Sequence, residues 1–260
     1  MDIFQGVAEN YTKYRGEYPK EMIELIISKL DLDNSSRLLD VGCGDGRLTF
    51  SLAPYFKEVL AIDISSEMIA KAKGNTKLNG INNITWLIKD AGNLDESVGK
   101  FSFIVFGQSL HWLNIEKILS FCHSILEPGG AVMVSQVPSI WNYAPTKWEQ
   151  KIIEIIKKYL GPKRRTINGF FERPKKSYED YLKEAGFVRL EEIEFIFPKT
   201  TKTADKIVEE QFTYSYATRI LFGDRAKDFE NELREELLKI NPENKFISET
   251  KGIITLAFKD

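Results

Sequence analysis

Short apolar segments alternate with segments of helical periodicity along the first half of the chain. One of them, residues 101–106, is apolar almost throughout, which is typical of a strand covered on both faces. Strands that alternate with helices favour a parallel sheet with helices on both sides, so we expect a doubly wound α/β fold. The predicted strands are residues 37–41, 58–63, 84–89, 101–106 and 131–137, and the helices between them are residues 47–56, 66–78 and 115–126.

The alternation stops after Pro138. A chain of 260 residues suits one large α/β domain, so we expect residues 1–260 to form a single domain with added helices. Helical spacing predicts further helices at residues 146–160, 177–185, 204–217 and 225–240, with strands at residues 187–197 and 252–259.

The composition is that of an ordinary soluble protein. Hydrophobic residues make up 43% and charged residues 28% of the chain, and a net charge of −2 gives no overall attraction to nucleic acid. Two cysteines cannot build a disulfide framework, and they lack the spacing of a metal site. No signal peptide is evident, and no apolar run approaches the ~20 residues needed to cross a bilayer. We therefore expect a cytoplasmic protein without a metal or membrane contact.

Candidate chemistry begins at Gly42-Cys43-Gly44-Asp45-Gly46, a glycine-rich turn between a predicted strand and a predicted helix. Such a turn lets a ligand lie against bare backbone at Gly42 and Gly44, with amide groups and the helix N-terminus facing it. Asp63 ends the next strand, 19 positions after Gly44. That spacing suits a carboxylate that accepts hydrogen bonds from both hydroxyls of a ribose.

Acidic residues beside this turn discriminate between two nucleotide cofactors. A dinucleotide would bring its pyrophosphate close to Asp40 and Asp45, and two like charges about 4 Å apart repel by about 4 kcal/mol at an effective dielectric constant of about 20. S-adenosylmethionine has no phosphate and carries an ammonium and a sulfonium, which a carboxylate attracts. The spacing Gly-x-Gly-x-Gly also departs from the Gly-x-Gly-x-x-Gly of dinucleotide sites. The acids favour S-adenosylmethionine.

Residues 38–46 resemble the first motif of Rossmann-like (class I) S-adenosylmethionine-dependent methyltransferases, and residues 59–63 resemble their second strand with its ribose-binding acid. The resemblance covers residues 11–137 well and the remainder in outline. It implies a seven-stranded, mostly parallel sheet of order 3-2-1-4-5-7-6 with strand 7 antiparallel, a position that suits residues 252–259.

The resemblance also implies further contacts to the cofactor, S-adenosylmethionine, whose product is S-adenosylhomocysteine. Asp90 would receive the exocyclic amine of adenine, the backbone of Ala91 would lie beside the ring, and Ile64 and Met68 would flank it. From the residues alone, Asp90 is also compatible with an exposed turn acid and Met68 with a core position.

The loop after the fourth strand reads Gln108-Ser109-Leu110-His111-Trp112. It resembles the corresponding loop of small-molecule methyltransferases related to trans-aconitate methyltransferase, in which the position of Gln108 lies near the methionine part of the cofactor. His111 is the histidine placed to act as a base, and Trp112 lies beside it on the substrate side. Two interpretations of His111 stay open, a catalytic base and a packing residue, because a methyl transfer to a carboxylate needs no base.

Aromatic residues outside the alternating region are the candidates for substrate contact. Tyr11, Tyr14 and Arg15 lie in an N-terminal segment, residues 1–30, that resembles the lid of this family, although many relatives have Arg-Pro where this chain has Arg15-Gly16. Tyr11 and Arg15 would meet the cofactor and Tyr14 the substrate, or the segment packs against the sheet. The helical insertions, residues 138–186 and 199–243, would form a substrate cover that contributes Trp141, Tyr214 and Tyr216, unless these rings are core.

Basic residues crowd between Lys157 and Lys176. Such a run is usually a solvated face, but it also suits an anionic substrate or RNA. Our interpretation is S-adenosylmethionine-dependent methyl transfer, at oxygen, to a small metabolite, with acidic metabolites among the candidates. The enzyme would be a monomer or homodimer with no nucleic-acid partner. The alternatives are an RNA methyltransferase and a non-catalytic S-adenosylmethionine-binding protein.

Overall fold

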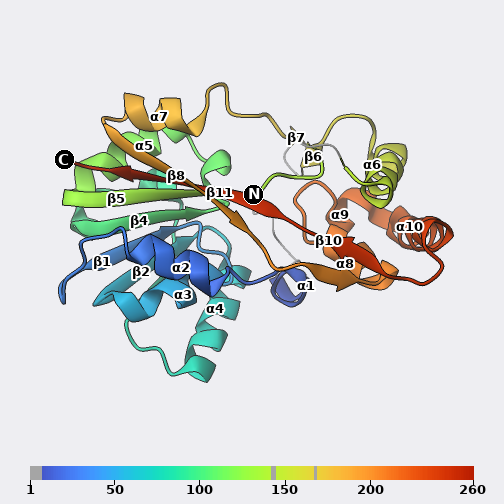
Figure 1. The fold of residues 1–260 in the computed structure, drawn as a ribbon, viewed down its shortest axis with the longest axis horizontal. Helices are drawn as coiled ribbons and strands as arrows, with labels where there is room; N and C mark the ends of the chain where they lie inside the picture. The colour runs from blue at the N-terminus through green and yellow to red at the C-terminus, as the bar shows by residue number, and fades with distance from the viewer. Residues whose placement is uncertain (1–7, 142–144, 167–168) are drawn as a thin grey trace. The chain divides into compact units, whose positions relative to one another are not determined.

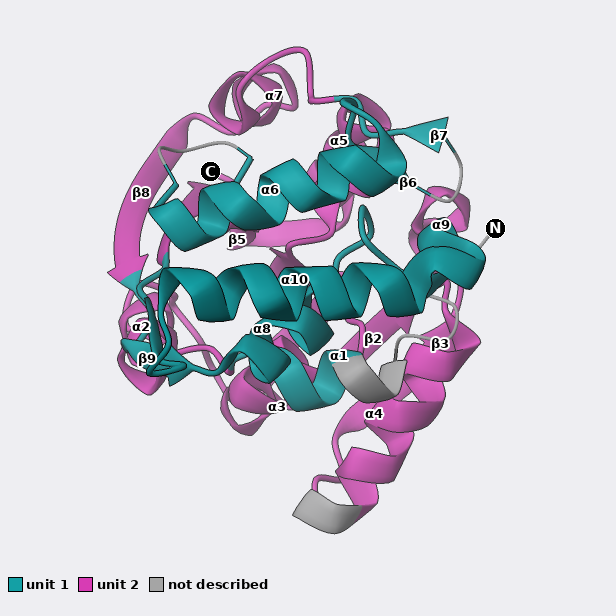
Figure 2. Ribbon diagram, turned by 90° about the vertical axis from the view of Figure 1, so that its right-hand side faces the viewer, with its two compact units in different colours: residues 1–16, 138–172, 196–250 teal, residues 17–137, 173–195, 251–260 magenta. Residues whose placement is uncertain are grey.

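The computed structural model describes residues 8–141, 145–166 and 169–260. Residues 1–7 of the predicted lid, and residues 142–144 and 167–168 of the first predicted insertion, lie outside the described residues. The chain divides into two compact units (Figures 1 and 2). Unit 1 comprises residues 1–16, 138–172 and 196–250, and unit 2 comprises residues 17–137, 173–195 and 251–260. The prediction of a single domain stays a prediction.

Unit 2 is built on a seven-stranded sheet of order β3-β2-β1-β4-β5-β11-β8. Strand β1 pairs in parallel with β2 and β4, while β11 pairs antiparallel with β5. With β8 counted as the sixth strand and β11 as the seventh, this order confirms the predicted fold. The strands are β1 (Arg37–Val41), β2 (Glu58–Asp63), β3 (Ile84–Ile88), β4 (Phe101–Gly107), β5 (Leu126–Gln136), β8 (Arg189–Ile196) and β11 (Lys251–Phe258).

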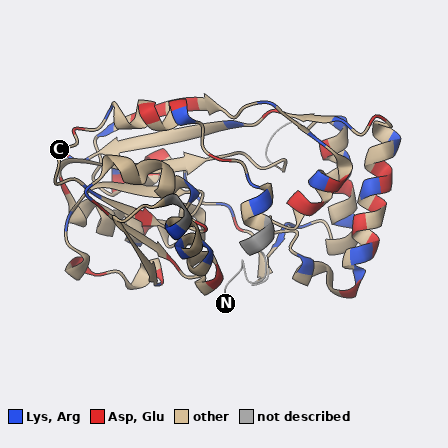
Figure 3. Ribbon diagram, turned by 90° about the horizontal axis from the view of Figure 1, so that it is seen from below, with Lys and Arg blue, Asp and Glu red and all other residues tan. Residues whose placement is uncertain are grey.

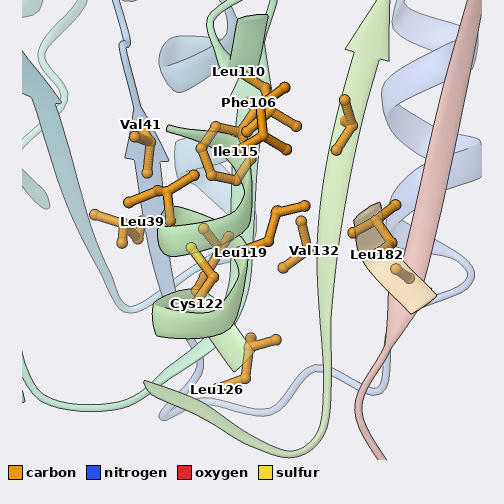
Figure 4. Close-up of a cluster of buried hydrophobic side chains, with 14 of the residues drawn as sticks. Leu39, Val41, Phe106, Leu110, Ile115, Leu119, Cys122, Leu126, Val132 and Leu182 are labelled. Atoms are coloured by element: carbon orange, nitrogen blue, oxygen red, sulfur yellow. The ribbon is translucent and has the colours of Figure 1, made fainter. Parts of the chain in front are cut away.

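The two faces of β1 have different partners. Leu39 and Val41 point into a buried cluster with Leu119 of α5 (Figure 4). Because successive side chains of a strand point to opposite faces, Asp40 lies on the other face, where it meets Thr49 of α3. The helices of unit 2 are α2 (Lys20–Ile27), α3 (Arg47–Leu52), α4 (Ser66–Asn79), α5 (Ile115–Ile125) and α7 (Tyr178–Glu184).

Helix ends in unit 2 follow local chemistry. The side chains of Ser65 and Asn114 each accept a backbone N–H at the start of α4 and α5. Helix α3 ends two residues before Pro54, since proline cannot continue the hydrogen-bonding pattern. Strand β5 begins at Leu126, earlier than predicted. A Cβ on Gly130 would lie 2.9 Å from a backbone oxygen of β4, so glycine permits this close approach of the two strands.

Unit 1 is largely helical, and its core gathers apolar side chains of α6, α8 and α10. The predicted helix over residues 204–217 is wrong beyond Gln211, where α8 ends. Thr213 donates its hydroxyl hydrogen bond to the Glu210 carbonyl, which competes with the helical pattern, and the chain turns. The elements are α1 (Ala8–Tyr14), α6 (Lys147–Leu160), β6 (Arg165–Thr166), β7 (Gly169–Phe170), β9 (Thr200–Lys202), α8 (Ala204–Gln211), α9 (Arg219–Phe222), α10 (Ala226–Ile240) and β10 (Phe246–Ser248).

Helix length also bears on membrane insertion. Among the described residues, no helix combines the length and the apolar character that a membrane span requires.

Candidate functional site

The glycine-rich turn joins β1 to α3 and is held by the neighbouring strand. The amides of Gly42 and Cys43 both donate to the Ile62 carbonyl, at 2.8 and 3.0 Å. Gly42 has φ +73°, and a Cβ there would lie 2.5 Å from the Cβ of Ser109. Gly44 has φ +56°, but its Cβ position has no atom within 4 Å. The turn is therefore closed against the protein at Gly42 and open at Gly44, where a ligand can approach the backbone.

Asp63 connects the ends of two adjacent parallel strands. Its Oδ2 accepts the Gly44 amide at 2.8 Å, and its Oδ1 accepts the Ser65 amide, also at 2.8 Å. The side chain is half-buried. A carboxylate has about four acceptor positions, so Asp63 can hold the turn and still accept two hydroxyl groups. The arrangement is compatible with the predicted ribose contact.

The two acids beside the turn are not both free negative charges, as the sequence-based choice between two cofactors assumed. Asp45 is ion-paired with Arg47 at 3.0 Å, so it does not act as a free negative charge. Asp40 is buried, and Thr49 donates its hydroxyl hydrogen bond to Oδ2 at 2.6 Å. Burial raises the pKa of Asp40 to about 7, with Asp63 adding to the rise and Thr49 opposing it. Asp40 Oδ1 is buried and has no hydrogen-bond partner among the described residues.

The loop after β4 meets the turn because β4 lies beside β1 in the sheet. Ser109 donates its hydroxyl hydrogen bond to the Val41 carbonyl, and so fixes the two loops to each other. Gln108 has φ +68°, uncommon for a residue other than glycine, and its amide donates to the Ser135 carbonyl at 2.8 Å. Sequence reasoning assigned no role to Ser109. The sequence offers only a weak signal for this role, since a small residue in a loop is common and the hydrogen bond to Val41 is visible only in the structure.

The two histidines have different surroundings. His111 lies half-buried in the short 3-10 turn Leu110–Trp112, with its ring centroid 4.8 Å from that of Trp112. His123 lies on α5 and packs edge-on against Phe187 at 5.0 Å, and burial lowers its pKa. The base role of His111 stays a prediction.

Of the four residues expected near adenine, Ile64 follows β2 directly, Met68 lies in the first turn of α4, and Asp90 and Ala91 lie just after β3. Ile64 is 54% exposed, whereas Met68 is 2% exposed. Asp90 is exposed and accepts the Gly92 amide at 2.8 Å, so its carboxylate already caps a short turn, and Ala91 is buried. Ile64 is therefore accessible to a ligand, while Met68 is largely covered by the protein.

Unit 1 contains a stack of rings around an arginine. The Arg15 guanidinium lies 4.0 Å from the ring centroid of Tyr214 and 5.1 Å from that of Tyr11. Tyr214 in turn stacks on Tyr216, with centroids 5.1 Å apart and an interplanar angle of 16°. Arg15 also donates to the Thr213 carbonyl at 3.3 Å. These residues come from two distant segments and form one cluster.

A second arginine extends the same stack. The Arg164 guanidinium lies 4.6 Å from the ring centroid of Tyr216 and 4.2 Å from that of Phe171. Trp141 meets Tyr216 edge-on at 5.8 Å, and Lys157 lies 5.5 Å above the Trp141 ring. We call this set the arginine–tyrosine stack. Its members are Tyr11, Arg15, Trp141, Arg164, Phe171, Tyr214 and Tyr216.

The predicted site residues therefore fall into two groups, one in each unit. Tyr14, predicted to touch substrate, is half-buried in unit 1, and Lys13 lies 5.1 Å above its ring. In unit 2 lie Asp40, Gly42, Gly44, Asp63, Ile64, Met68, Asp90, Ala91, Gln108, His111 and Trp112, and in unit 1 lie Tyr11, Tyr14, Arg15, Trp141, Tyr214 and Tyr216.

Comparison with known proteins agrees with this geometry. Residues 38–130 match the family described as "Methyltransferase domain". A Dictyostelium discoideum protein named as a methyltransferase is 25% identical to this chain, over 92% of this chain and 86% of its own length. A Saccharomyces cerevisiae protein named as an S-adenosylmethionine-dependent methyltransferase is 32% identical to this chain, over 46% of this chain and 42% of its own length.

A solved structure shows the same fold. The phosphoethanolamine N-methyltransferase 2 of Haemonchus contortus, in complex with S-adenosylhomocysteine, superimposes with a TM-score of 0.58 at 14% identity, covering 99% of this chain and 59% of that one. The seven-stranded sheet, the glycine turn and the matched domain together identify the chain as a class I S-adenosylmethionine-dependent methyltransferase.

The turn fits S-adenosylmethionine on its own geometry. The open space at Gly44 admits a ligand to the backbone, and the unpartnered oxygen of Asp40 is an acceptor suited to a cation. The narrower resemblance to methyltransferases related to trans-aconitate methyltransferase stays a prediction.

Proposed function

We propose that the protein methylates an oxygen atom of a small, acidic metabolite. S-adenosylmethionine supplies a methyl group on a positively charged sulfur, which is already activated for transfer. What the chain adds is orientation of the acceptor and exclusion of water, because positioning accounts for much of the acceleration of such a displacement. The observation that carries the proposal is the arginine–tyrosine stack, whose two guanidinium groups suit an anion.

The cofactor is assigned to the turn of unit 2. Asp63 accepts the ribose hydroxyls, the backbone at Gly44 faces the ligand, and Asp40 supplies negative charge toward the cationic part. Support comes from the amide contacts of Asp63, the open space at Gly44 and the unpartnered oxygen of Asp40. The proposal also includes, as cofactor contacts, Gly42, Ile64, Met68, Asp90, Ala91 and Gln108.

The loop of His111 and Trp112, which follows β4 in unit 2, is assigned to the acceptor. A carboxylate acceptor is already deprotonated near pH 7, so its oxygen attacks without a base. In that case His111 orients the acceptor and removes no proton. A hydroxyl acceptor would instead require a base. His111, which is half-buried in the 3-10 turn after β4, is the residue assigned to that role.

The charges of the basic run argue against an RNA acceptor. Lys158 is ion-paired with Glu232 at 2.7 Å, and Lys176 with Glu184 at 2.7 Å. Arg164 stacks between aromatic rings. Figure 3 shows Lys and Arg interspersed with Asp and Glu along the described helices. Cations engaged in this way offer a weaker field to a phosphate backbone than an unpaired patch would.

Radiolabelled methyl transfer to pooled acceptors tests the proposal. The pools are small carboxylic acids, alcohols and phenols, amines, and tRNA. Each is incubated with the full chain and labelled S-adenosylmethionine below saturation, and Asp63→Ala is the control with weakened cofactor binding. We expect label in the carboxylic acid pool. Because methyl esters hydrolyse in mild base, base treatment should release this label as volatile methanol. Label that enters only tRNA or only amines contradicts the proposal, and a base-stable product in the alcohol and phenol pool identifies a hydroxyl acceptor instead of a carboxylate.

A further inference from the structure

Ser109 joins two turns at the carboxyl end of the sheet. Strand β4 lies between β1 and β5, so the loop after β4 lies beside the glycine-rich turn after β1. Ser109 is 9% exposed, and its hydroxyl donates a hydrogen bond to the carbonyl of Val41, the last residue of β1. Its own carbonyl accepts the Trp112 amide at 3.0 Å. One residue thus bonds both to the start of the glycine-rich turn and to the 3-10 turn that carries His111 and Trp112.

The missing side chain of Gly42 makes room for this contact. A Cβ on Gly42 would lie 2.5 Å from the Cβ of Ser109 and 3.0 Å from its hydroxyl oxygen. The first distance is too short for two carbon atoms, so a larger residue in place of Gly42 would displace Ser109. The first glycine of the turn therefore provides space for the neighbouring loop, a space that the sequence-based interpretation assigned to the ligand.

The residue before Ser109 is fixed to the other neighbouring strand. Gln108 follows Gly107, the last residue of β4 that pairs with β5. The side-chain amide of Gln108 donates to the Ser135 carbonyl at 2.8 Å and to the Ser135 hydroxyl at 3.3 Å. Its φ of +68° is uncommon for a residue other than glycine, and such a backbone persists where its surroundings hold it. Two consecutive side chains therefore bond to opposite neighbours of β4, and the loop is held from both sides.

A second serine on β4 shows what a purely structural link looks like. Ser102, near the amino end of the strand, is also 9% exposed. Its hydroxyl accepts the Arg37 amide at 3.3 Å and donates to Glu127 at 2.7 Å, so it links β4 to the same two strands, β1 and β5. Ligands of open α/β sheets bind at the carboxyl ends of the strands. Of the two serines, only Ser109 is placed where such a link can affect a reaction.

Methyl transfer is sensitive to a link of this kind. The reacting atoms have to lie about 3–3.5 Å apart and in line, and a displacement of about 1 Å can lower the rate about 10²-fold. The glycine-rich turn is assigned to the cofactor, and the turn of His111 and Trp112 to the acceptor. Ser109 bonds directly to both.

We propose that Ser109 is a positioning residue for methyl transfer, which holds the turn of His111 and Trp112 at a fixed place beside the glycine-rich turn. The inference rests on the proposed function for the assignment of that turn to the acceptor. Ser109 itself acts through the two turns that it joins and contacts neither the acceptor nor the cofactor. The same role applies to a carboxylate acceptor and to a hydroxyl acceptor, since both have to be aligned.

Three measurements on the full chain test this role. The first is the dissociation constant of S-adenosylhomocysteine by calorimetry. The second is the initial rate of methyl transfer at saturating labelled S-adenosylmethionine, with whichever of the four acceptor pools the wild type labels. The third is amide hydrogen exchange by NMR at Trp112 and Leu113, whose amides donate to backbone carbonyls within the turn, with S-adenosylhomocysteine bound. The variants are Ser109→Ala and Ser109→Cys, and Ser102→Ala is the matched control.

We expect Ser109→Ala to lower the rate by about tenfold to a hundredfold, because the acceptor is no longer aligned. It leaves S-adenosylhomocysteine binding within about threefold, since the glycine-rich turn stays bonded to the Ile62 carbonyl. Exchange at Trp112 and Leu113 becomes about tenfold faster or more. Ser102→Ala changes each of these quantities by less than about twofold. Ser109→Cys has a weaker donor of similar size, so its rate falls between those of the wild type and Ser109→Ala. It is the decisive variant if Ser109→Ala does not fold.

Four outcomes overturn the proposal. Ser109→Ala keeps the wild-type rate; Ser102→Ala lowers the rate as much as Ser109→Ala, which indicates a general loss of stability; Ser109→Ala weakens S-adenosylhomocysteine binding as much as it lowers the rate, which would place Ser109 at the cofactor; or exchange at Trp112 and Leu113 is unchanged, which shows that the hydroxyl does not hold the turn. Label in the amine or tRNA pool refutes the proposed function, and the role of Ser109 is then decided by the same measurements. If the wild type labels no pool, the exchange measurement decides it.

Discussion

Substitution of Asp40 by asparagine removes a buried ionisable group while nearly preserving its shape. Burial raises the pKa of Asp40 to about 7, against an ordinary value of 3.8. A folded state that binds the proton more tightly than the unfolded state loses stability as the pH rises between these two values. The shift of about 3 units corresponds to about 4 kcal/mol at 1.36 kcal/mol per unit.

The assay is denaturant unfolding of the wild type and Asp40→Asn from pH 4 to pH 8. We expect the free energy of unfolding of Asp40→Asn, relative to the wild type, to rise by about 4 kcal/mol over this range, since the variant has no charge to bury. Asp33→Asn is the control with the opposite sign. Hydrogen bonds from Ser35 lower the pKa of Asp33, so that carboxylate stabilises the fold above its ordinary pKa.

Cofactor binding gives the same group a second, independent readout. If the ionised form of Asp40 attracts the cationic donor, affinity for S-adenosylmethionine rises by up to about tenfold from pH 6 to pH 8, following the ionised fraction of a group with a pKa of about 7. In Asp40→Asn this affinity is independent of pH. Equal pH profiles of stability and of affinity in the two proteins would refute the assignment of a raised pKa to Asp40.

Three further predictions concern the same turn and loop. Asp63→Ala weakens S-adenosylhomocysteine binding by about 1–3 kcal/mol in calorimetry, and an unchanged affinity excludes the ribose contact. Gly44→Val abolishes cofactor binding. The control is Gly80→Val, because Gly80 also has a positive φ and no atom within 4 Å of its Cβ position; this variant loses similar stability and keeps cofactor binding. Loss of binding in both variants means that backbone strain, and not the space for the ligand, is responsible. His111→Ala lowers kcat by less than about tenfold on a carboxylate acceptor, because such an acceptor needs no base. A general base contributes about 10²–10⁴-fold, so a loss of that size shows that His111 removes a proton.

Local patterns in the sequence were sufficient to predict the parallel strands and the glycine-rich turn, while the order of the sheet came from the family resemblance. Buried parallel strands read as apolar runs, and the glycine turn with Asp63 at the following strand end lies within one strand–helix–strand unit, so spacing along the chain reflects spacing in the fold. The caps of α4 and α5 are also local, since each depends on one side chain and the backbone next to it.

Charge state and long-range contacts were decided by tertiary structure. The sequence shows Asp40 as an acid, but only its burial raises its pKa to about 7, against the opposing effect of the hydrogen bond from Thr49. Likewise Arg15 and Tyr214 are remote in sequence, and nothing local predicts that a guanidinium from one stacks on the ring of the other. Desolvation and stacking depend on every neighbour that excludes water, and those neighbours come together only when distant segments pack.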